Sequence, residues 1–168
     1  DLTFPFKRYQ MNKVYRGEKQ QKGRYREFYQ CDIDVIGNES LDLVFDAEIP
    51  TIIYHVFKEL NIGEFVIKIN NRKVLNGFFE SLELSDKVTD ILRTIDKIDK
   101  IGKEAVKEEL IKFEISEEKA DKILNFIAIT GSNSEILEKL EELKIENETF
   151  KNGLFELNEV VKNLKAFN

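Results

Sequence analysis

The sequence has few of the residues on which several kinds of site depend. It contains one cysteine, one histidine, two prolines and no tryptophan. One cysteine excludes a disulfide framework and any metal site with several cysteines, and one histidine excludes zinc sites built on paired histidines. No stretch reaches the ~18 consecutive apolar residues of a membrane span. The N-terminal residues also lack the basic and then apolar pattern of a secretory signal.

What is present is a globular composition with an uneven charge. The 168 residues carry a formal charge of −6, with 42% apolar residues, which suits one domain or one domain with a smaller appendage. Residues 1–31 carry +5, so the remainder carries −11. A basic N-terminal part is typical of anion binding, although a solvated loop gives the same pattern. Residue 1 is Asp and the only methionine is Met11, so we expect a processed chain or a piece of a longer protein.

The first half of the sequence mixes strand and helix patterns. Aromatic and β-forming residues predict two strands, Phe4–Tyr15 and Tyr25–Ile36, joined by a polar loop that ends in glycine. Apolar residues at helical spacing predict a helix over Asp46–Leu60, with Asp46 as its cap. Alternation predicts a third strand over Glu64–Asn70, and Arg72–Leu82 is typical of a short helix. The order β-β-α-β-α indicates an α+β fold with an antiparallel sheet.

Residues 85–168 have the composition of successive helices, rich in Lys, Glu, Ile and Leu. The predicted helices are Ser85–Ile101, Lys103–Phe113, Glu117–Ile129, Ser134–Leu143 and Asn147–Phe167. Ser132 followed by Glu135 has the spacing of a capping box. We therefore expect two domains, an α+β part over residues 1–84 and an all-helical part over residues 85–168.

The predicted strand Tyr25–Ile36 has two contrasting faces. One is largely apolar and includes Cys31, which we expect in the core and not as a nucleophile. The other consists of Arg24, Arg26, Phe28, Gln30, Asp32 and Asp34. Arginine suits phosphate, an aromatic ring stacks on a base, and an amide or carboxylate oxygen accepts from an ammonium or imidazole group. This face predicts a ligand with phosphate at one end and a cation at the other, the alternative being an ordinary solvated sheet face.

Two stretches resemble a known family. Val14-Tyr-Arg-Gly-Glu18, followed by Lys22-Gly-Arg-Tyr-Arg-Glu-Phe-Tyr-Gln-Cys-Asp32, resembles motif 2 of the class II aminoacyl-tRNA synthetases, and more narrowly that of the histidyl-tRNA synthetases. Ile69–Gly77 resembles a stretch of that family beyond motif 2. The helical tail is similar to the insertion domain between motifs 2 and 3. The resemblance implies part of a class II catalytic domain over residues 1–84 and the insertion domain over residues 85–168.

The resemblance also implies a role for each matching residue in ATP binding. Arg16 is the implied catalytic residue, because it would contact the α-phosphate and the histidine carboxylate as that carboxylate attacks phosphorus. Glu18 would bind the adenine amino group and Arg24 the outer phosphates. Phe28 would stack on adenine. ATP with Mg²⁺ is then a substrate complex, and no structural metal is expected.

Histidine would be held by the same strand. The resemblance implies that Arg16 contacts its carboxylate, that Gln30 binds its α-amino group and that Asp34 accepts a hydrogen bond from its imidazole. Some members of the family have Glu at the last position, so the acid role is kept here with a shorter reach.

The function implied by the resemblance is histidine–tRNA ligation by a cytoplasmic homodimer, with histidine, ATP and tRNA-His as partners. We expect this piece alone to be inactive, because motif 1, motif 3 and an Arg-Gly-Leu-Asp-Tyr-Tyr-type segment are not in it. One alternative is the related regulatory subunit of ATP phosphoribosyltransferase, against which the complete ATP set argues. Another is a helical interaction module with a fortuitous motif. The residues from Ser85 on carry −5, so a tRNA contact there rests on the resemblance and not on charge.

Overall fold

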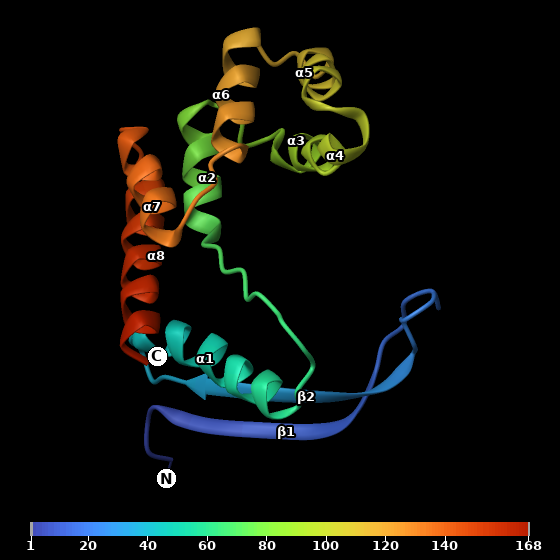
Figure 1. Ribbon diagram of the computed structural model, residues 1–168, viewed down its shortest axis with the longest axis vertical. Helices are drawn as coiled ribbons and strands as arrows, with labels where there is room; N and C mark the ends of the chain where they lie inside the picture. The colour runs from blue at the N-terminus through green and yellow to red at the C-terminus, as the bar shows by residue number, and fades with distance from the viewer. Residues whose placement is uncertain (1, 168) are drawn as a thin grey trace. The chain divides into compact units, whose positions relative to one another are not determined.

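The computed structural model describes residues 2–167. Over this range it contains one two-stranded antiparallel sheet and eight helices, so the α+β class is confirmed (Figure 1). The chain divides into two compact units. The first runs through Ile67 and also takes in the residues from Asn163 on, and the second is Lys68–Lys162. None of the helices in the described range has the length and apolar character that crossing a membrane requires.

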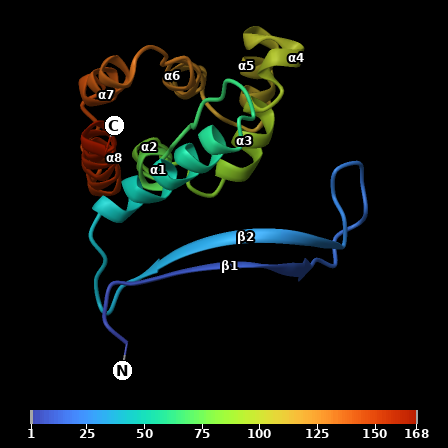
Figure 2. The same ribbon diagram turned by 60° about the horizontal axis from the view of Figure 1, so that its bottom comes forward.

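The first unit is built on a long β-hairpin. β1 (Phe6–Tyr15) pairs with β2 (Glu27–Ile36), with Phe6 opposite Ile36 at one end and Tyr15 opposite Glu27 at the other. Both strands agree with the sequence prediction within two residues at their ends. Figure 2 shows the pair as a curved ribbon whose connecting loop extends beyond the strands.

α1 (Val44–Glu59) contacts the start of this hairpin through its first turns. Lys7 Nζ of β1 lies 2.5 Å from Glu48 Oε1 and 5.2 Å from the centroid of the Phe45 ring. The helix begins two residues before the predicted cap, so Asp46 lies inside its first turn. Asp42 Oδ1 instead accepts from the backbone N–H of Val44, at 2.9 Å.

The first unit buries little apolar surface within the described residues. Ala47 is the one buried apolar side chain between residues 2 and 67. On β2 the polar face is half-buried, while Tyr29 is 74% exposed and Cys31 is exposed. The core position predicted for Cys31 is therefore wrong. The alternating pattern identified the two faces of the strand, but it did not show which of them other residues would cover.

The predicted third strand over Glu64–Asn70 is also wrong. The segment forms no ladder, and the sheet contains β1 and β2 alone in the described part of the chain. It is held by aromatic packing, with the Phe65 ring 5.3 Å from that of Phe57 and 5.7 Å from that of Tyr54. An alternating sequence suits a strand, but a strand also needs a neighbour to receive its backbone hydrogen bonds.

The second unit contains the core of the molecule. Its helices are α2 (Arg72–Ser81), α3 (Val88–Ile95), α4 (Ile98–Ile101), α5 (Lys103–Lys112), α6 (Glu117–Ile127), α7 (Asn133–Glu142) and α8 (Glu148–Phe167), the last of which extends beyond the unit. The predicted helices are present, except that Ser85–Ile101 is divided between α3 and α4. The capping box of Ser132 and Glu135 is present at the start of α7. It lowers the pKa of Glu135, mainly through the backbone N–H of Ser132.

The division between the units falls before α2 and not near Ser85. Val74, Phe78 and Phe79 of α2 belong to the same buried cluster as Ile91 of α3 and Phe150 of α8. The border expected near Ser85 therefore lies inside the second compact unit. The amino-acid composition changes at Ser85, but the apolar face of α2 packs against the later helices.

α2 and α8 approach so closely that glycine is required at their crossing. A Cβ at Gly77 would lie 2.2 Å from the backbone nitrogen of Phe150, and one at Gly153 would lie 2.5 Å from that of Val74. Glu156 of α8 also accepts from Asn71 Nδ2 at 2.8 Å and from Lys73 Nζ at 2.5 Å. These contacts hold the pKa of Glu156 below its usual range, with Lys73 as the main cause. The crossing thus combines close backbone packing with hydrogen bonds from Asn71 and Lys73 to Glu156.

Candidate functional site

A pocket lies where the hairpin strands meet their connecting loop. It has a volume of about 340 Å³ and is lined by Arg16, Glu18, Gly23, Arg24, Tyr25 and Phe28. That volume is within the ordinary range of small-molecule sites. Four of the six residues expected to bind ligand line this one pocket, and the other two lie further along β2 on the same face.

Local backbone geometry explains how the loop brings these side chains back to the strands. The N–H of Arg24 donates to the Gln21 carbonyl at 2.9 Å, which closes a four-residue turn. Gly23 occupies the third position with φ +78°, a conformation that glycine adopts without strain. Beyond the strands, the N–H of Arg16 donates to the Arg26 carbonyl at 2.8 Å and continues the pairing by one step. The turn residues therefore return Arg24 to the side of Arg16.

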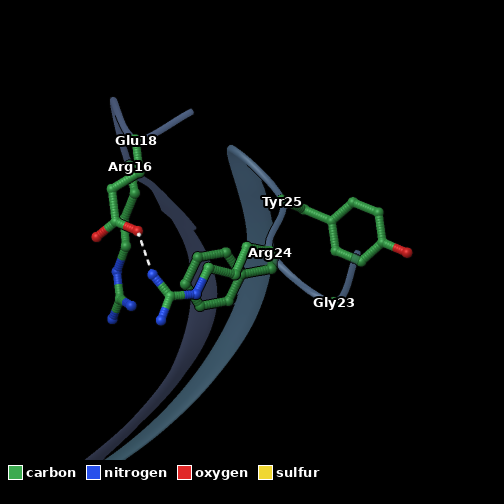
Figure 3. Close-up of a pocket in the computed structure, with 6 residues that line it drawn as sticks. Arg16, Glu18, Gly23, Arg24 and Tyr25 are labelled. Atoms are coloured by element: carbon green, nitrogen blue, oxygen red, sulfur yellow. Dashed lines mark hydrogen bonds and ion pairs between the residues drawn. The ribbon is translucent and has the colours of Figure 1, made fainter. Parts of the chain in front are cut away.

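The pocket holds two guanidinium groups and one carboxylate. In Figure 3 the side chains of Arg16, Glu18 and Arg24 gather on one side, while Tyr25 points away from them. Glu18 Oε2 lies 3.4 Å from Arg24 Nη1, and both side chains are more than half exposed. An exposed ion pair of this kind contributes little to stability, so either partner is available to a ligand. The Arg16 guanidinium lies over the Phe28 ring, 4.9 Å from its centroid, as a cation–π contact.

A chain of hydrogen bonds leads from the pocket along β2. Arg16 Nη2 donates to Gln30 Oε1 at 2.9 Å, and Gln30 Nε2 donates to Asp32 Oδ1 at 2.6 Å. These two contacts fix the orientation of the Gln30 amide, with its oxygen toward Arg16. Gln30 is thus connected to the pocket through Arg16, although it does not line the pocket.

The last expected residue, Asp34, lies further along the strand and has a partner that the sequence did not point to. Asp34 Oδ2 lies 2.7 Å from Nη2 of Arg8, which is its cross-strand neighbour in the β1–β2 register. The contact of Asp32 with Gln30 was likewise not expected. The sequence signal for Arg8 was its even number, because even-numbered residues of β1 share a face and Arg16, which follows the strand, has the same parity. Only the register of the hairpin turns that signal into a contact.

Comparison with known proteins identifies the chain. The family model described as "Histidyl-tRNA synthetase" matches residues 5–168. The chain belongs to the histidyl-tRNA synthetase family. It is 57% identical over 168 residues to the histidine–tRNA ligase of Clostridium tetani and 48% identical over 169 residues to that of a Nostoc species. The resemblance noted in motif 2 is thereby confirmed.

A solved structure of a histidyl-tRNA synthetase also matches. The crystal structure of histidyl-tRNA synthetase from Nostoc sp. PCC 7120 superposes with a TM-score of 0.87 at 47% identity over 99% of this chain. The chain covers 38% of that structure's chain, and likewise 38% of the Clostridium tetani relative. It therefore spans less than half the length of the histidyl-tRNA synthetases that it matches.

Proposed function

We propose that this chain is the motif 2 section and insertion domain of a histidine–tRNA ligase, which forms histidyl-adenylate from histidine and ATP and transfers histidine to the 3′ end of tRNA-His. The observation that carries the proposal is the convergence of Arg16, Glu18, Arg24 and Phe28 on one pocket. In this assignment, residues 1–84 belong to a class II catalytic domain and residues 85–168 form the insertion domain. This division by family differs from the division into compact units, in which α2 packs with the later helices. The intact protein would act as a homodimer in the cytoplasm, where tRNA is charged.

The pocket suits a nucleotide that carries phosphates. Two arginines supply fixed positive charge and planar N–H groups for phosphate oxygens. The Phe28 ring offers a surface for a base, and the Glu18 carboxylate offers an acceptor for the adenine amino group. ATP enters as its Mg²⁺ complex, in which the metal neutralises part of the phosphate charge. Glu18 and Arg24 exchange their weak mutual contact for contacts with ATP.

Arg16 is the proposed catalytic residue. A carboxylate oxygen of histidine attacks the α-phosphorus of ATP, the new P–O bond forms, and the bond to pyrophosphate breaks. In the transition state, negative charge builds on the oxygens of the α-phosphate. A guanidinium group held beside those oxygens stabilises this charge. The contact with Gln30 Oε1 and the position over Phe28 hold the Arg16 side chain in place before the substrates arrive.

Gln30 and Asp34 are proposed to read the amino acid. Gln30 Oε1 has two lone pairs and accepts one bond from Arg16, so the second lone pair is available to the α-ammonium group. Asp34 then accepts from an imidazole N–H further along the strand. The alternative function as a regulatory subunit of ATP phosphoribosyltransferase is not favoured, because the matched relatives are histidine–tRNA ligases.

Replacing Arg16 tests the proposal. In the full-length protein that carries this segment, we expect Arg16→Ala to lower histidine-dependent ATP–pyrophosphate exchange by a factor on the order of 10² to 10³, as when a single electrostatic donor to a transition state is removed. Lys13→Ala is the matched control, because Lys13 lies on β1 three residues before Arg16 and pairs with Glu27 on the opposite face of the hairpin. If Arg16→Ala left exchange intact and slowed only the transfer to tRNA, the role given to Arg16 would be wrong.

A further inference from the structure

Arg8 and Asp34 form an ion pair whose stabilising effect is small. The two residues are directly opposite in the register of β1 and β2, with 2.7 Å between Nη2 and Oδ2. The Arg8 side chain is 49% exposed and that of Asp34 is 42% exposed. A pair this exposed adds little to the free energy of unfolding. The contact can still orient the Asp34 carboxylate, because it places a guanidinium nitrogen beside Oδ2.

The charges along this face explain why one oxygen of Asp34 matters. Asp32 lies on the same face, and its Oδ1 is occupied by the Gln30 amide. Asp34 Oδ2 lies beside the Arg8 guanidinium, whereas no hydrogen bond from another side chain of the described residues reaches Oδ1. A carboxylate alone rotates about its last torsion and presents either oxygen, whereas one held by a guanidinium presents the other oxygen in a fixed direction.

We infer that Arg8 is a positioning residue for histidine recognition, which holds Asp34 Oδ2 so that Oδ1 faces the imidazole N–H. The inference rests on the proposed role of Asp34 in binding histidine. Arg8 also keeps the charge of this carboxylate balanced on the face that already carries Asp32.

The test compares variants of the full-length protein by ATP–pyrophosphate exchange, with histidine and ATP varied separately. We expect Arg8→Met to raise the KM for histidine by about tenfold, because the hydrogen bond from the imidazole N–H to the Asp34 carboxylate would be lost. An effect of about tenfold is typical of one hydrogen bond to a charged group. The KM for ATP and the melting temperature should stay unchanged, and Arg8→Lys should recover most of the affinity. In an Asp34→Asn background, Arg8→Met should add little, because both changes remove the same interaction.

Lys13→Met is the matched control, since the Lys13–Glu27 pair has similar exposure on the other face of the hairpin. An unchanged KM for histidine in Arg8→Met would overturn the inference, as would an equal rise in the KM for ATP or a lack of recovery in Arg8→Lys. Two outcomes separate this inference from the proposed function. If Asp34→Asn raises the KM for histidine but Arg8→Met does not, only the role of Arg8 fails. If neither variant changes it, the role of Asp34 fails as well.

Discussion

The side chains around the pocket are arranged on strands but are only weakly bound to one another. Glu18 and Arg24 meet at 3.4 Å while remaining largely exposed, and Arg16 lies over Phe28 without a carboxylate partner in the described residues. Such contacts are easily replaced, because little desolvation has occurred before a ligand arrives. The hairpin backbone therefore sets the position of each Cα atom, while the side-chain contacts can change when a ligand binds.

Phe28 provides the prediction at the scale of single residues. In the full-length protein, Phe28→Leu should raise the KM for ATP by about tenfold, because stacking of a base on an aromatic ring contributes roughly 1–3 kcal/mol. The KM for histidine should change less, since the proposed amino-acid contacts lie further along β2. Exchange kinetics with ATP varied would measure this. Tyr29→Leu, on the exposed face of the same strand, is the control, and a similar rise in that variant would contradict a stacking role.

The sequence was sufficient to predict which residues form this site, but not which of them contact one another. Alternation places Phe28, Gln30 and Asp34 on one face, and the structure agrees. The exposure of Cys31 could not be predicted, because burial depends on what covers a face and not on the face itself. The pair of Arg8 and Asp34 depends on strand register, which is a non-local property.

At the scale of elements, helices were predicted more reliably than the third strand because their hydrogen bonds are internal. The short helix predicted over Arg72–Leu82 agrees with α2 within one residue. Glu64–Asn70 has an equally good alternating pattern, but its ladder would have to come from a distant neighbour. The position of α2 in the second unit follows from Gly77 and Gly153, whose close contacts with α8 and α2 are not visible in local sequence.

The crossing of α2 and α8 gives the prediction at this scale. Gly77→Ala should destabilise the chain by about 1–3 kcal/mol, because the added methyl would overlap the Phe150 backbone, which cannot rotate aside. The helix propensity of alanine offsets only about 1 kcal/mol of that strain. Urea unfolding of the 168-residue chain, followed by circular dichroism, would measure the change.

Gly17→Ala is the matched control, because a Cβ there meets nothing within 4 Å. An unfolding midpoint for Gly77→Ala at or above that of the control would show that the two helices can separate at no cost. The close crossing would then not be a requirement of the fold.

At the scale of the whole molecule, the two units differ in how much core they have. The second unit holds the buried cluster that runs from Val74 to Val161, whereas the first buries Ala47 alone among its apolar residues from 2 to 67. Each strand of the hairpin has one neighbour in the described residues, so each also has an edge with unpaired backbone groups. The proposed nucleotide site is therefore carried by the unit with the smaller core.

This difference predicts the behaviour of the isolated chain. We expect the purified 168-residue chain to show no histidine-dependent ATP–pyrophosphate exchange. Glu18 and Arg24 at the proposed nucleotide pocket are more than half exposed, so the pocket does not exclude water from the reaction. The full-length protein in the same assay is the positive control, and circular dichroism would verify that the helices of the isolated chain are formed. Robust turnover by the isolated chain would show that the hairpin pocket is sufficient for adenylation.

The register of the hairpin has a consequence for how the length of this segment can vary. Residues may be added or removed in the loop around Gly23 without changing which side chains of β2 share a face with Arg16. Removing one residue between Phe28 and Asp34 would instead move Asp34 to the face of Tyr29 while leaving Phe28 in place. Natural length variation in active relatives should therefore fall in the loop. The number of residues between Phe28, proposed to stack on adenine, and Asp34, proposed to bind imidazole, should stay odd.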